Sequence, residues 1–112
     1  LPESFDDYSL LTTLDDQNGK TYVYTNKQGQ IMQFSYSHAS NGENLYVNAE
    51  DYEVFADLVG NNPADIYISK TDERENVIIW QDNSQNVLFT ISGFVNHEEL
   101  LEIAKRVEKI SK

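Results

Sequence analysis

The chain has 112 residues, a formal net charge of −11 and no cysteine. The absence of cysteine excludes a disulfide framework, a thiolate nucleophile and a cysteine-ligated zinc site. Nucleic acid is not an expected partner, because so acidic a body repels phosphate backbones. At this length we expect one domain, residues 1–112, around one hydrophobic core.

The negative charge is concentrated in the first 95 residues, which hold fifteen acidic and four basic side chains, whereas residues 96–112 hold four of each. An acidic surface attracts cations, basic peptides or a cationic cell-wall polymer, but most often it only keeps a protein soluble. No stretch approaches the roughly 20 apolar residues of a transmembrane helix. Since the chain opens without an initiator methionine, we expect a mature or trimmed form whose upstream segment is missing, which is compatible with a removed signal or membrane anchor.

The chain begins with a predicted strand over residues 8–14. Its alternation places four residues on one face: Tyr8, Leu10, Thr12 and Leu14. The turn that follows contains Asn18-Gly19, which is the strongest two-residue hairpin signal in the sequence.

A second hairpin is predicted between residues 21–25 and 31–36, across the polar turn at 26–29. Its large side chains form one continuous stripe if the two strands share a face: Tyr22, Tyr24, Met32, Phe34 and Tyr36. The stripe has two interpretations. It is either core, or an exposed platform on which Tyr22, Tyr24, Phe34 and Tyr36 bind a glycan or peptide. We favour core, because large exposed apolar patches are uncommon on monomers.

The middle of the chain is less regular. Residues 38–44 read as a polar loop and 45–47 as a short strand. Residues 51–59 fit both a helical spacing and a period of two, and we expect a strand or an irregular edge segment. The breaker at 60–63 ends it, and residues 64–69 alternate as another strand.

The last forty residues predict two strands and a helix. Residues 77–80 are apolar on both faces, which is typical of a central strand covered on each side, and 87–93 form its hairpin partner. Asn96 is placed to cap the helix, and Glu99 to reach back to the Asn96 backbone N–H. Either Phe94 or Val95 can contact Leu100 across the cap. The apolar stripe of the helix must be buried: Leu100, Ile103, Ala104, Val107 and Ile110.

Together these elements predict an α+β domain, in which a twisted antiparallel sheet of six to eight strands, built from hairpins, carries the C-terminal helix on one face.

Signals for catalysis are absent. His38 and His97 have no nearby partner in the sequence, and His97 at a helix start is expected to be a surface residue. No serine elbow or glycine-rich phosphate loop occurs. Residues 15–19 resemble the opening of a calcium loop but lack its alternating carboxylates and closing glutamate. We therefore expect no catalytic residue, no metal site and no cofactor.

Three segments carry a resemblance to a known family: Ile79-Trp80-Gln81-Asp82, Phe89-Thr90-Ile91-Ser92-Gly93 and Glu98-Glu99-Leu100-Leu101-Glu102-Ile103-Ala104. With the opening phrase at residues 1–5, where Ser4 replaces a common glycine, the chain resembles a bacterial domain family of unknown function. That family occurs mainly in Gram-positive bacteria, at the C-terminal, extracytoplasmic end of membrane-anchored, lipoprotein-like and anti-sigma-factor-like proteins.

The resemblance implies a noncatalytic sensor or binding module outside the membrane, with a protein, peptide or cell-envelope component as its partner. Membrane contact would come only through the missing N-terminal anchor. Two alternatives remain open: a hydrolase-like enzyme with an acidic cleft, using a pair such as Glu75 and Asp82, and a structural or oligomerisation domain.

Overall fold

The computed structural model describes residues 4–5, 7–15, 19–38, 49–71, 74–82 and 87–110. In chain order the elements are β1 (Ser4–Phe5), β2 (Tyr8–Asp15), β3 (Gly19–Thr25), β4 (Ile31–His38), the 3₁₀ turn η1 (Ala49–Asp51), β5 (Tyr52–Val59), β6 (Asn62–Ser69), β7 (Asn76–Asp82), β8 (Val87–Gly93) and α1 (His97–Ile110).

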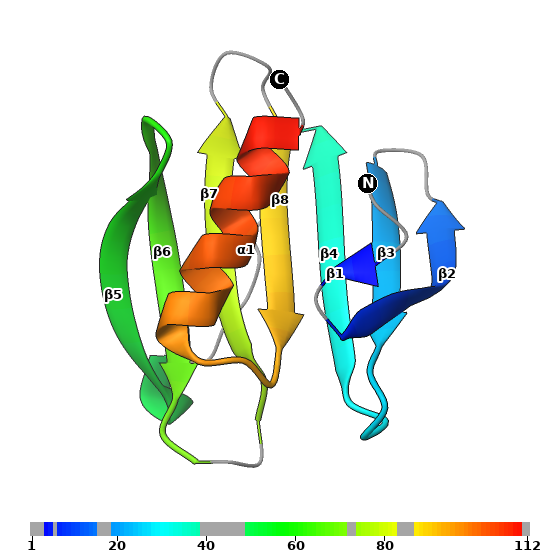
Figure 1. Cartoon of the computed structure of the whole chain (residues 1–112). Coiled ribbons are helices and arrows are strands. Elements are labelled where there is room, and N and C mark those ends of the chain that lie inside the picture. The colour runs from blue at the N-terminus through cyan, green and yellow to red at the C-terminus, as the bar shows by residue number, and fades with distance from the viewer. Residues whose placement is uncertain are drawn as a thin grey trace.

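The strands form one antiparallel sheet in the order β1-β2-β3-β4-β8-β7-β6-β5. Each neighbouring pair is a hairpin except β4–β8, where the end of the chain returns to join two sets of hairpins. The helix α1 lies across one face of this open sheet (Figure 1). The predicted α+β class, the hairpin-built sheet and the helix on one face are therefore confirmed.

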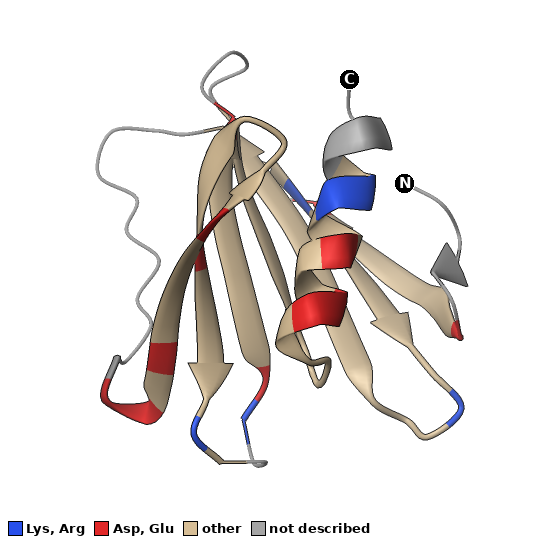
Figure 2. Ribbon diagram, turned by 60° about the vertical axis from the view of Figure 1, so that its left-hand side comes forward, with Lys and Arg blue, Asp and Glu red and all other residues tan. Residues whose placement is uncertain are grey.

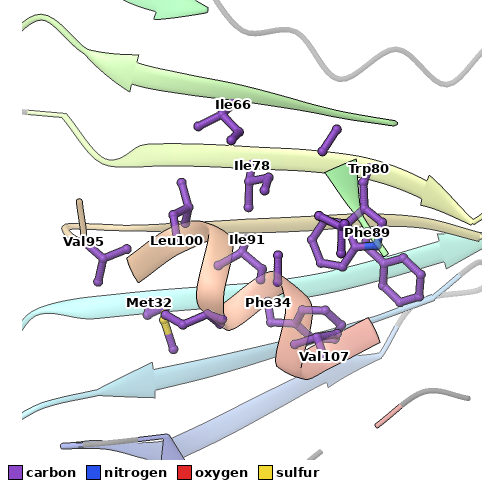
Figure 3. Packing of buried hydrophobic residues seen from close by; sticks show 14 of the residues in the cluster. Met32, Phe34, Ile66, Ile78, Trp80, Phe89, Ile91, Val95, Leu100 and Val107 are labelled. Atoms are coloured by element: carbon purple, nitrogen blue, oxygen red, sulfur yellow. The ribbon is translucent and has the colours of Figure 1, made fainter. Parts of the chain in front are cut away.

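The core lies between α1 and the centre of the sheet. Trp80 of β7 stacks on Phe89 of β8, with ring centroids 5.0 Å apart, and Phe89 stacks in turn on Phe34 of β4 at 6.0 Å. Above them four residues of the predicted helix stripe are buried, namely Leu100, Ile103, Ala104 and Val107, and Leu100 and Ala104 have no exposed surface. Figure 3 shows Leu100 and Val107 of the helix above these strand residues. This contact closes the apolar core of the domain.

The start of α1 follows the predicted cap. The Asn96 side-chain oxygen accepts a hydrogen bond from the Glu99 backbone N–H at 2.9 Å. The Glu99 carboxylate contacts the Asn96 side-chain amide at 3.2 Å, in place of the backbone N–H that we expected. Val95, which is 6% exposed, is buried with Leu100, whereas Phe94 points outward and is 42% exposed. The residue that packs across the cap is therefore Val95.

The prediction that alternate residues of the first strand all share one face is wrong beyond Leu10. The register of β2 against β3 shifts between Leu10 and Thr12, so Leu11 is an extra residue in the ladder. A β-bulge of this kind bends the strand and reverses the alternation that follows it. Leu10 consequently faces the core beside Tyr24, while Leu14 is 60% exposed.

The expectation that residues 77–80 are covered on each side is also wrong on one side. Ile78 and Trp80 are buried beneath α1, with 0% and 1% of their surface exposed. Val77 and Ile79, which alternate with them, are only half-buried. No helix of the described chain packs on their side of the sheet (Figure 1).

The ambiguous segment at 51–59 is the edge strand β5, which pairs with β6 through eight successive residues. Gly60 adopts φ 63° in the tight connection that follows, a conformation that favours glycine. Pro63, expected in the breaker, lies inside β6 opposite Leu58. The loop and short strand expected at 39–47, and most of the turn at 16–18, lie outside the described residues.

Replacing Leu100 with alanine tests the contact between helix and sheet. Leu100→Ala leaves a cavity in the core and should lower the free energy of unfolding by about 2–5 kcal/mol. Leu11→Ala, which removes the same atoms from a side chain that is 61% exposed, should cost about 0.5 kcal/mol or less. Urea denaturation of both variants measures the difference, and equal losses would contradict the docking of α1.

Candidate functional site

The predicted aromatic stripe belongs to the core. Tyr24 and Phe34 are 0% and 3% exposed on the helix side of the sheet. Tyr22 and Tyr36 are half-buried and pack against the same core, and each ring lies near Phe34, at 5.8 Å and 6.3 Å between centroids. The core interpretation thus holds for Tyr24 and Phe34. Only Tyr22 and Tyr36 keep surface that a ligand could touch.

The hydroxyl of Tyr24 is held neutral. Burial raises the pKa of Tyr24 to about 12, with a smaller contribution from the neighbouring Tyr22. Removing a proton here would place an unsolvated charge inside the core. Tyr24 therefore does not act as a base near neutral pH.

The structure does not bring Glu75 and Asp82 together. Glu75 precedes β7 and Asp82 ends it, so the length of a strand, about 20 Å at the usual rise per residue, separates them. Asp82 is 2% exposed on the helix side. Glu75 lies beside Ser92, whose hydroxyl donates to its carboxylate, and burial raises the pKa of Glu75 more than this hydrogen bond lowers it. Two carboxylates so far apart do not form a catalytic pair.

The histidines are also separate. His38 is exposed at the end of β4, and the half-buried ring of His97 lies 5.1 Å from the ring of Phe55. Within the described ranges, no group of three histidine, aspartate or glutamate residues is close enough to hold a metal ion. From the suggested calcium segment, the structure describes Asp15, whose carboxylate lies 3.8 Å from the Lys20 ammonium, and Gly19.

The face of the sheet turned away from α1, which we call the open face, is the larger candidate surface. Residues opposite one another in an antiparallel ladder point to the same face, so the register defines its rows. One row runs across six strands, from β5 to β3: Ala56, Asp65, Ile79, Thr90, Ser35 and Thr21.

The open face carries almost no charge. Asp65 is the one charged residue among the described strand residues of this face, where serine, threonine, glutamine and aliphatic side chains predominate. A second carboxylate, that of the half-buried Glu75 just before β7, lies beside Ser92 at one end of the face. In Figure 2 the acidic residues, drawn in red, lie along β5, at η1 and on α1, while the central strands are nearly free of charged residues. In a chain with a net charge of −11, this surface differs from its surroundings.

A shallow, open groove of about 290 Å³ lies on this face, over β6, β7 and β8, and is lined by Pro63, Asp65, Ile79, Gln81 and Leu88. The ladder between β6 and β7 ends at Ala64 and Trp80, just before Pro63 and Gln81 would pair. Proline has no N–H to donate, so the ladder stops there and the groove begins at the same place. Asp65 and Gln81 supply its polar atoms, and Ile79 and Leu88 its apolar wall.

Sequence reasoning did not identify the open face. Its signal is the alternation in β4 of Gln33, Ser35 and Ser37 with the buried Met32 and Phe34 and the half-buried Tyr36. Ser92 and Thr90 alternate similarly in β8. The pattern indicates a face exposed to water, but only the register joins these short polar runs into one surface.

The raised pKa of Glu75 makes stability depend on pH. The folded protein holds this proton more tightly than the unfolded chain, so Glu75 lowers stability as pH rises from about 4.3, the ordinary glutamate value, through the raised pKa. Glu75→Gln removes the charge and should be more stable than the parent protein at pH 7, with the advantage disappearing towards pH 4. Thermal denaturation across this range measures it.

The matched control for this prediction is Glu53→Gln, which removes the same charge from an exposed position on β5. The difference in stability between Glu53→Gln and the parent protein should not increase from pH 4 to pH 7, as the difference for Glu75→Gln should. A stability profile for Glu75→Gln that matched the control would show that burial does not penalise the Glu75 carboxylate.

Comparisons with other proteins add the family. No helix among the described residues has the length and apolar character needed to cross a membrane. No curated protein and no solved structure matches the chain. One family profile matches residues 1–107, nearly the whole chain, and the chain therefore belongs to the family described as a domain of unknown function, DUF4367.

Proposed function

We propose that this domain is a noncatalytic binding module that holds a polypeptide partner on the open face of its sheet. The observation that carries the proposal is the near absence of charge on this face, in a domain whose net charge is −11. The centres of protein interfaces are depleted of charged residues. A surface whose strands carry a single charged residue, Asp65, in so acidic a chain has the composition of such a centre.

The chemistry of the groove supports a polypeptide ligand. Ile79 and Leu88 offer apolar contact, and the Gln81 amide can both donate to and accept from a backbone. A sugar ring usually stacks on an exposed aromatic face. The aromatic pair on the open face, Tyr52 and Tyr67, is packed edge to face at 6.3 Å between centroids. A cell-envelope glycan is therefore the weaker candidate ligand.

We also propose that the domain acts as an extracytoplasmic sensor or binding unit, tethered to the membrane through its parent protein. The support is the resemblance carried by the opening residues, the Trp80 strand and the closing helix. The absence of cysteine is compatible with an extracytoplasmic location, because a protein outside the membrane does not require disulfide bonds in order to fold.

Site-specific photocrosslinking tests the open face. Benzoylphenylalanine is introduced at Gln81 in the groove, or at Glu102, which is exposed on α1, in the full-length parent protein in its own cells. Irradiation should give one discrete protease-sensitive adduct from Gln81 and none from Glu102. A second change, Thr90→Lys, places a charge in the adjacent row and should remove the adduct, since desolvating an unpaired charge is costly.

The alternative results are distinguishable. An adduct degraded by glycan hydrolases and resistant to protease would indicate an envelope polymer. An adduct of twice the parent mass would indicate self-association, as expected of an oligomerisation domain. Equal adducts from Gln81 and Glu102, or none from either, would contradict binding at the open face.

The location has its own test. Protease added to intact cells, with the wall removed and the membrane sealed, should degrade this domain in the parent protein and leave a cytoplasmic control protein whole. Detergent should then make both proteins sensitive. A domain that is protected until detergent is added would place it on the cytoplasmic side and overturn the proposed location.

A further inference from the structure

The strand β5 is a long, regular and exposed edge of the sheet (Figure 1). Its residues 53–58 are all exposed, and it pairs without a bulge along the whole of β6. The opposite edge differs, because β2 is bulged and pairs with the short β1 through Tyr8 and Ser9. Proteins usually protect an edge with charged side chains, proline or a bulge. The strand β5 has no proline and no bulge, and its charged side chains are the two carboxylates of Glu53 and Asp57.

The positions of Pro63 and Ser69 in β6 show which backbone groups of β5 point outward. In an antiparallel pair, residues that exchange two hydrogen bonds alternate with residues whose polar groups point away. Pro63 has no N–H, so its pairing with Leu58 is of the second kind. Ser69, six residues further along β6, should lie in the same kind of pair as Pro63. Its N–H indeed points towards β7 and donates to the Asn76 side chain at 2.7 Å.

The outward-pointing residues of β5 are therefore Tyr52, Val54, Ala56 and Leu58. The N–H of Leu58 donates to the side chain of its neighbour Asp57 at 2.7 Å. Within the described chain, no backbone group bonds the outward N–H and C=O of Val54 and Ala56. As far as the described residues go, the middle of this edge can accept another strand without loss of a hydrogen bond to Val54 or Ala56.

The two sides of the edge differ in chemistry. On the helix side Glu53 and Asp57 are exposed. On the open-face side Val54 and Leu58 are 51% and 54% exposed. An added strand would thus meet carboxylates with one set of alternating side chains and aliphatic groups with the other.

A second copy of this chain would meet like charges in one symmetric register at this edge, although a pairing centred on Ala56 would avoid them. An antiparallel pairing centred on Phe55 would place Glu53 of one copy opposite Asp57 of the other. Like charges directly opposite in a ladder are destabilising. The charge of β5 instead complements a cationic strand, and the net charge of −11 would attract such a segment from a distance.

We propose that β5 binds an extended basic peptide as a ninth strand, with lysine or arginine side chains towards Glu53 and Asp57 and aliphatic side chains towards Val54 and Leu58. The proposal rests on the proposed function in treating the domain as a binding module, but it uses the sheet edge in place of the groove. On binding, Asp57 exchanges the Leu58 N–H for a cationic side chain, and the incoming strand takes that N–H.

The test uses a labelled peptide of about eight residues, the length of a strand, in which lysine and valine alternate. Fluorescence anisotropy should show binding that weakens between low and high salt. Two control peptides should not bind: one in which glutamate replaces lysine, and one with the same side chains but N-methylated at alternate residues facing β5. Binding of the N-methylated peptide at equal affinity would show that no ladder forms and would overturn the proposal.

Matched protein variants locate the contact. Ala56→Pro removes an outward N–H and leaves the hydrogen bonds to β6 in place, so it should weaken binding about tenfold or more. Ala56→Val keeps the N–H and should bind like the parent protein. Equal affinity for the two variants would overturn the proposal. If Ala56→Pro unfolds, Asp57→Lys provides the second variant, and its affinity for the lysine peptide should fall.

Two measurements separate this proposal from the proposed function. The Gln81 photocrosslink should persist in Ala56→Pro, because the groove does not use the outward edge. Loss of peptide binding with the crosslink intact defines the edge as a separate site. If the parent protein gives the crosslink but does not bind the lysine peptide, the proposal of strand addition at β5 is overturned and the proposed function is not. Sizing chromatography should show a monomer, and a β5-dependent dimer would contradict the choice of partner.

Discussion

The packing of α1 on the centre of the sheet determines the use of every other surface in this domain. Ala104 and Leu100 of the helix have no exposed area, and Trp80 and Phe89 stack 5.0 Å apart in the sheet face beneath it. Burial of large apolar and aromatic side chains is the main favourable term in folding. Since the chain has one long helix in its described part, only one face of the sheet receives such a cover. The other face must remain compatible with water.

This division explains how much of the fold the sequence could predict. The strands at 21–25, 31–36 and 87–93, and the helix start at Asn96, follow from local signals, namely alternation, turns and a cap. The bulge at Leu11 has no such signal, because two adjacent leucines fit either face of a strand. The apolar residues Val77 and Ile79 led to the wrong prediction that both faces of this strand are covered. Apolar side chains alone do not show whether a second layer packs on a face of the sheet.

The candidate site was less predictable than the fold. Aromatic side chains suggested a binding platform, but Tyr24 and Phe34 contribute to the core, where such side chains stabilise most. Glu75 and Asp82 are near in sequence but lie at opposite ends of a strand, so sequence proximity misleads about a catalytic pair. The open face depends on residues from six strands, such as Ser35 and Thr90, which meet only through the register of β4 with β8.

Pro63 links the groove to the sheet edge. On the side of β7, Pro63 ends the hydrogen-bonded ladder, and the groove begins there. On the side of β5, its missing N–H breaks no hydrogen bond, because Pro63 and Leu58 form a pair without mutual hydrogen bonds. Val54 and Ala56 occupy the same kind of pair as Leu58, without mutual hydrogen bonds to β6, so their backbone N–H and C=O groups point outward from the sheet. A strand added at β5 would also lengthen the row that contains Ala56, Asp65 and Ile79. A partner that pairs with the edge would therefore extend the open face by one strand without rearranging the core.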